Sequence, residues 1–103
     1  MKERTDLQNK LEQILGSRNV YFQPPESIRM KYPCFVYERS GMDVKLADNK
    51  KYKKYVRYQL MYITKEPDTN DVISDILDAF DYISYDRHFI IDSLHHEVFN
   101  LYY

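Results

Sequence analysis

The clearest pattern in the chain is an alternation of apolar and polar positions between residues 52 and 64. Four apolar side chains share one face at a spacing of two residues: Val56, Tyr58, Leu60 and Tyr62. The other face begins polar at Arg57 and becomes apolar at Met61 and Ile63. This pattern predicts a strand that starts at the surface and enters the core as it runs.

Two further stretches have helical spacing. Residues 5–15 are expected to form a helix that begins at Thr5 as its N-cap and stops at Gly16. Its apolar stripe consists of Leu7, Leu11, Ile14 and Leu15. Residues 70–82 are expected to form a second helix, whose apolar stripe consists of Val72, Ile73, Ile76, Leu77 and Phe80. Its N-cap is expected to be one of three polar residues: Asp68, Thr69 or Asn70.

Four shorter apolar runs predict strands at residues 20–22, 34–39, 87–92 and 97–103. The polar and basic segment from Ser40 to Lys51 is expected to be a loop that joins two antiparallel strands. The order is therefore helix, three strands, helix, two strands, which indicates the α+β class. We expect one domain over residues 1–103, with a mostly antiparallel sheet of about five strands and two helices packed on one face.

Composition limits the class of protein. The chain has 103 residues, 44% of them apolar, which is enough for one domain with its own core. Its net charge of -1 lacks the basic excess that non-specific nucleic-acid binders usually show. The single cysteine, Cys34, excludes an internal disulfide and a cysteine-based metal motif. The polar start and the absence of a long apolar run predict a soluble protein made in a cytoplasm, without a membrane partner.

We expect no catalytic, cofactor-binding or metal-binding site. Cys34 lies within an apolar strand pattern, where a free cysteine behaves as a small hydrophobe. His95, His96 and Glu97 have side chains that bind metals, but neighbours on a strand face opposite ways, so a metal site would need ligands from elsewhere. The two glycines of the chain are too few for a phosphate-binding loop.

Charge is distributed unevenly along the chain. Positions 45 to 57 contain one acid and six basic residues: Lys45, Lys50, Lys51, Lys53, Lys54 and Arg57. Positions 66 to 81 contain six acids and no base, and four of these acids share one predicted helix face: Asp71, Asp75, Asp78 and Asp81. One interpretation is two solvated surfaces whose charges balance. The other is that the basic hairpin of one subunit meets the acidic helix of the next, a head-to-tail contact that can close into a ring.

Several segments carry a resemblance to a known family. They are residues 32–37 (YPCFVY), 47–52 (ADNKKY), 57–58 (RY), 86–89 (DRHF) and 92–103 (DSLHHEVFNLYY), with residues 66–68 before the second helix. In this order they resemble the small tail terminator proteins of long-tailed bacteriophages and prophages, also called tail completion or head–tail joining proteins. The resemblance covers roughly residues 30–103 and rests on the order and wording of the segments, without a mechanism-bearing motif.

The resemblance implies α+β subunits that form a hexameric ring. The ring would cap the tail tube, end tail growth and join the tail to the head connector. It implies a virion protein assembled in the bacterial cytoplasm, with the tail tube protein and the connector or neck protein as partners, and with DNA passing through the lumen. A connector-side neck protein is the structural alternative. An RNA-cleaving, toxin-like enzyme that uses Arg87, His88 and His95 is the alternative from another class.

Overall fold

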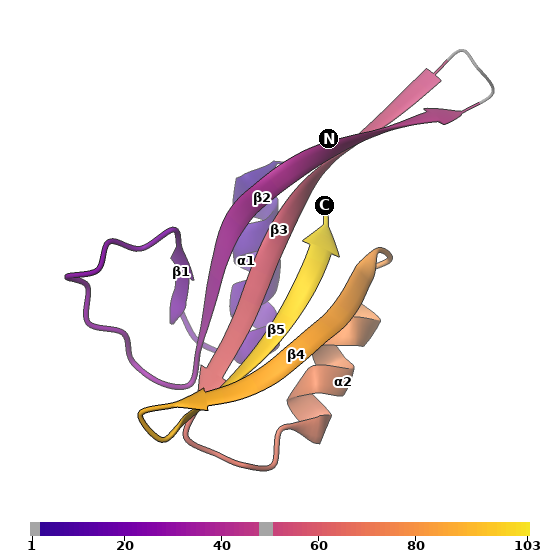
Figure 1. The fold of residues 1–103 in the computed structure, drawn as a ribbon. Helices are drawn as coiled ribbons and strands as arrows, with labels where there is room; N and C mark the ends of the chain where they lie inside the picture. Colours follow the sequence, from indigo (N-terminus) through magenta and orange to yellow (C-terminus); the bar gives the residue numbers. More distant parts are fainter. Residues whose placement is uncertain (1–2, 48–50) are drawn as a thin grey trace.

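The computed structural model describes residues 3–47 and 51–103 (Figure 1). The elements are α1 (Arg4–Leu15), β1 (Val20–Phe22), β2 (Cys34–Ala47), β3 (Lys51–Thr64), α2 (Asn70–Ala79), β4 (Ile83–Ile91) and β5 (Leu94–Tyr102). They follow the predicted order of helix, three strands, helix and two strands. The α+β class is therefore confirmed, with five strands and two helices.

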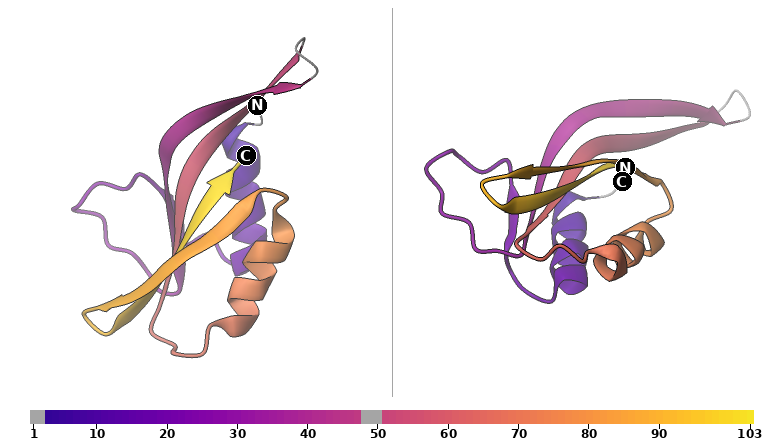
Figure 2. Two further views of the ribbon diagram at one scale, coloured as in Figure 1. Left: turned by 45° about the vertical axis from the view of Figure 1, so that its right-hand side comes forward. Right: turned by 60° about the horizontal axis from the view of Figure 1, so that its bottom comes forward.

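The five strands form one sheet in the order β1-β2-β3-β5-β4. β1 pairs with β2 in parallel, and the other three pairs are antiparallel, including the predicted pairing of β2 with β3. Both helices lie on the same face of this sheet, as predicted (Figure 2). β3 sits in the middle of the sheet, between β2 and β5, and the two edges are β1 and β4.

The larger hydrophobic cluster lies between the sheet and the helices. Tyr58 and Leu60 of β3 enter it from the sheet, Leu11 enters it from α1, and Ile76 enters it from α2. Leu60 and Ile76 are both completely buried, which confirms the faces predicted for the two elements. Burial of these side chains is the main favourable contribution to the stability of the fold.

A polar contact fixes α1 on this face. The Tyr37 hydroxyl of β2 is buried, donates a hydrogen bond to Oε1 of Gln8 at 2.6 Å and accepts one from Nη1 of Arg4 at 3.0 Å. A buried hydroxyl without such partners would destabilise the fold. The helix therefore has a defined position along β2 as well as a buried stripe.

The other face of the sheet carries a smaller hydrophobic cluster. Cys34, Val36 and Ile63 are buried there, and Met30 and Tyr32 pack on them from the segment between β1 and β2. Burial raises the pKa of the Cys34 thiol to about 12, so the thiol stays protonated. Cys34 is therefore a small core residue, as its strand pattern predicted.

The expected loop from Ser40 to Lys51 is wrong. β2 continues to Ala47 and β3 begins at Lys51, so most of the segment is a hairpin with paired strands. The reason is a register shift between Arg39 and Gly41, where a bulge lets the strand continue beyond a break in its alternation.

Several predicted boundaries also differ. α1 has Glu3 rather than Thr5 at its N-cap, and α2 ends at Ala79 rather than at residue 82. β4 begins at Ile83 rather than at residue 87. β5 begins at Leu94 rather than at residue 97, because a two-residue turn at Asp92 and Ser93 joins it directly to β4. Both turn residues have positive φ, 52° and 64°, which is the backbone that tight hairpin turns require.

The buried position of Leu60 makes a quantitative prediction. Leu60→Ala is expected to lower the free energy of unfolding by about 2–5 kcal/mol, because it removes buried apolar surface and leaves a cavity. The measurement is urea denaturation followed by circular dichroism. Gln13→Ala, at an exposed position of α1, is the control and should stay within about 0.5 kcal/mol of the original protein. Equal stabilities for the two variants would contradict the assigned core.

Candidate functional site

The most distinctive feature of the surface is the distal part of the β2–β3 hairpin. We call residues 41–47 and 51–55 the arm, which extends beyond the end of the sheet in Figure 1. β1 pairs with β2 up to Tyr37, and β5 approaches β3 up to the backbone bonds between Val56 and Tyr103. Within the described part of the chain, the two strands of the arm therefore pair only with each other.

Two hydrogen bonds between Ser40 and Arg57 join β2 to β3 at the base of the arm. The Ser40 hydroxyl donates to the Arg57 carbonyl oxygen at 3.1 Å, and Nη2 of Arg57 donates to the Ser40 carbonyl oxygen at 3.3 Å. The Arg57 guanidinium crosses Gly41 so closely that a Cβ there would lie 2.5 Å from Nη2. A glycine next to the bulge therefore leaves room for the Arg57 side chain at the base of the arm.

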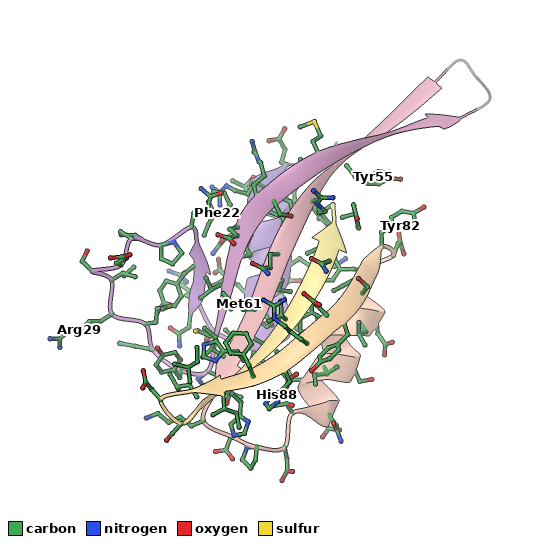
Figure 3. All side chains as sticks on the ribbon, in the orientation of Figure 1. Phe22, Arg29, Tyr55, Met61, Tyr82 and His88 are labelled. Carbon is green, nitrogen blue, oxygen red and sulfur yellow. The ribbon has the colours of Figure 1, made fainter. Side chains whose placement is uncertain are left out.

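A second contact at the base of the arm comes from β3, where Tyr55 packs on Tyr82. The rings of Tyr55 and Tyr82 lie edge to face, with centroids 5.2 Å apart (Figure 3). Desolvation, a side-chain hydrogen bond with Tyr82 and the negative charge of Asp81 raise the pKa of the Tyr55 hydroxyl. This contact links the arm to the connection between α2 and β4.

The basic residues predicted from the sequence lie on or beside the arm. Lys45 belongs to β2, and three lysines belong to β3: Lys51, Lys53 and Lys54. In the register of the hairpin, Lys45 stands opposite Lys53. Lys50 and the side chains of the other four lysines lie outside the described residues. Arg57 is half-buried at the base of the arm, where it bonds to Ser40.

The acidic residues divide into two groups. Asp71, Asp75 and Asp78 are exposed on one face of α2, as the helical spacing predicted. Asp81 is also exposed, but it lies beyond the end of α2, so the acidic helix face has three members and not four. The arm extends away from α2 within one chain (Figures 1 and 2).

A buried carboxylate forms a separate polar cluster beneath β4. Glu97 is only 4% exposed; its Oε1 accepts a hydrogen bond from the Thr69 hydroxyl at 3.1 Å, and its Oε2 accepts one from the Tyr85 hydroxyl. Nε2 of His88 lies 3.8 Å from Oε1 of Glu97 and 3.0 Å from Nδ1 of His95. Sequence reasoning missed this cluster, although a carboxylate on the core face of a strand requires partners.

The cluster does not assemble the trio expected of an RNA-cleaving enzyme. His88 and His95 meet, but Arg87 lies on the other face of β4, with its guanidinium 5.8 Å from the centroid of Phe89. His96 is on that other face too, stacked on Phe89. Among the described residues, no group of three or more His, Cys, Asp and Glu side chains is arranged to hold a metal ion. The hydrogen bonds of the cluster join three elements, because Thr69 lies at the start of α2, Tyr85 on β4 and Glu97 on β5.

Comparison with known proteins adds no family assignment. No protein-family model matches the chain, and no curated protein matches its sequence. In the described part of the chain, no helix is both long and apolar enough to cross a membrane.

The Glu97 cluster predicts a measurable contribution to stability. Tyr85→Phe is expected to lower the free energy of unfolding by about 1–3 kcal/mol, because a buried carboxylate loses one of its donors. In a Glu97→Gln background the same substitution should change the free energy of unfolding less, because the Tyr85 hydroxyl no longer donates to a charged carboxylate. Equal effects in the two backgrounds, measured by urea denaturation, would contradict this pairing.

The same cluster predicts an alkaline response. Burial, the hydrogen bond to Glu97 and the Glu97 charge raise the pKa of Tyr85 from 10.0 to about 12. Because the folded pKa is raised, this contribution to stability is complete below pH 10 and is lost as the pH rises towards 12. An NMR titration of isotope-labelled tyrosine should find Tyr85 among the last tyrosines to ionise. In Glu97→Gln its pKa should fall, and an unchanged pKa would exclude Glu97 as a cause.

Proposed function

We propose that this protein is a tail terminator of a long-tailed bacteriophage or prophage, a non-enzymatic subunit of a hexameric ring. The ring caps the tail tube, ends tail growth and offers a docking face to the head connector. It is assembled in the host cytoplasm and becomes part of the virion. The proposal draws on the resemblance of residues 30–103 to that family and on the arm described above.

The unpartnered arm is the observation that carries the proposal. A two-stranded hairpin is at best marginally stable in water by itself, because it buries little apolar surface. The arm also leaves main-chain donors and acceptors on both of its outer edges without a strand partner in the described part of the chain. Contact with a neighbouring subunit would supply both burial and hydrogen bonds. An arm of this kind therefore fits a chain that works in an assembly.

The charges fit the same assembly. The arm contains Lys45, Lys51, Lys53 and Lys54, whereas α2 presents Asp71, Asp75 and Asp78. A contact between the arm of one copy and α2 of the next uses two different surfaces, so it is head-to-tail and can close into a ring. Lysines of the arm that face the lumen would meet the phosphates of passing DNA.

Charge reversal tests this contact. Reversing Lys53 and Lys54 to Glu, or Asp75 and Asp78 to Lys, is expected to block assembly and leave the fold intact. Combining both reversals should restore assembly at least partly, because opposite charges face each other again. Assembly of the unaltered protein should also slow as salt rises, since the screening length falls from about 10 Å at 0.1 M to about 3 Å at 1 M.

The measurement is sedimentation of the four proteins at low and high salt, with circular dichroism to check the fold. If the combined variant assembles no better than either reversal alone, the two surfaces do not meet. Co-sedimentation with tail tubes separates a terminator from a connector-side neck protein, because only the terminator binds the tube end. A stable monomer that cleaves RNA would overturn the proposed ring and favour the enzyme alternative.

A further inference from the structure

We propose that the free edge of β4, over residues 87–91, is the docking site for the arm of a second copy, which adds a strand to the sheet by main-chain pairing. This inference rests on the proposed ring and names the surface that the arm occupies there. The acidic face of α2 alone would offer only side chains to the arm.

β4 has an open edge in the described part of the chain. It pairs with β5 on one side and is the last strand of the sheet on the other. A register shift between Tyr85 and Arg87 interrupts its regular pairing, so the continuous part of the edge runs from Arg87 to Ile91. An open edge exposes unpaired N–H and C=O groups, which are a template for another strand.

Exposed apolar side chains gather on this strand. Six large hydrophobic side chains are exposed in the described residues, and four lie on β4 or directly before it: Tyr82, Tyr85, Ile90 and Ile91. Ile90 is 56% exposed and Ile91 is 54% exposed, although neighbours on a strand face opposite sides of the sheet. A partner lying on one face would cover only one of them. A strand added at the edge flanks both faces and contacts both side chains.

The arm can supply a strand that pairs with the open edge of β4. The outer edge of β2 is free from Gly41 to Ala47 within the described residues, which is long enough to pair along residues 87–91. Met42, on the arm, is 49% exposed and is the fifth of the six exposed apolar side chains. α2 lies beside the first half of β4, and the second half of β4 extends away from α2 toward the turn that leads into β5 (Figures 1 and 2).

Directed disulfide formation tests the pairing in the full chain. The native Cys34 is completely buried, so it does not compete with an introduced thiol. Two proteins are mixed and oxidised, one with Ile90→Cys and the other with a single cysteine in place of Met42, Val44 or Leu46. At least one mixture should give a cross-linked pair in about tenfold excess over the control, because docking raises the effective concentration of the two thiols.

The control replaces Ile28, the sixth exposed apolar residue, which lies outside both surfaces. Cross-linking of Ile90→Cys with itself in tenfold excess would overturn the inference and indicate a two-fold contact between β4 strands. Rings that form without any cross-link between arm and β4 would also overturn it and leave the proposed function standing. A protein that stays monomeric under all conditions would overturn both.

Hydrogen exchange on the unaltered protein gives an independent readout. On assembly, the amides of residues 87–91 and of residues 41–47 should slow together, because the same main-chain bonds protect both. Slowing of the arm amides alone would show that the arm docks elsewhere and would contradict the inference.

Discussion

The register of β3 is the constraint on which the rest of the structure depends. One half of this strand is locked in the core by Tyr58 and Leu60, and the other half forms the arm. A slip of one residue would move these side chains to the opposite face, so burial fixes the register strongly. Because the two halves are one continuous strand, the core also fixes which residues the arm presents to a neighbour.

A second constraint couples the helix to the edge strand. Glu97 on β5 accepts hydrogen bonds from Thr69, at the start of α2, and from Tyr85 on β4. The N-cap position of α2 therefore uses its hydroxyl for a tertiary contact rather than to cap the helix. Loss of this carboxylate would loosen α2 and β4 together. In the proposed ring, these are the two elements that would receive the arm.

Much of the fold could be predicted from the sequence, because periodicity reports burial directly. The alternation around Leu60 and the helical stripe around Ile76 gave both elements and their buried faces. The arm was not predicted, because it lies outside the core and its lysine-rich composition resembles that of a loop. Its alternation was present at Met42, Val44 and Leu46, but the bulge before them shifts the phase of the pattern.

The candidate site was harder to predict for a different reason. The partners of Glu97 are 28 and 12 residues away in the sequence, so no local spacing indicates them. The turn at Asp92 and Ser93 contains no glycine, which hid the start of β5 at Leu94. The edge strands of a sheet can be identified only when the order of its strands is known.

Ring closure places a requirement on the base of the arm. A head-to-tail contact closes into a ring only when each subunit is rotated by the same fixed angle from the last; otherwise it grows as a helix. In this chain that angle would depend on the bulge at Ser40 and Gly41, where Arg57 bonds across the two strands. Charges on α2 and on the arm would orient the encounter, and main-chain pairing would hold the docked strand.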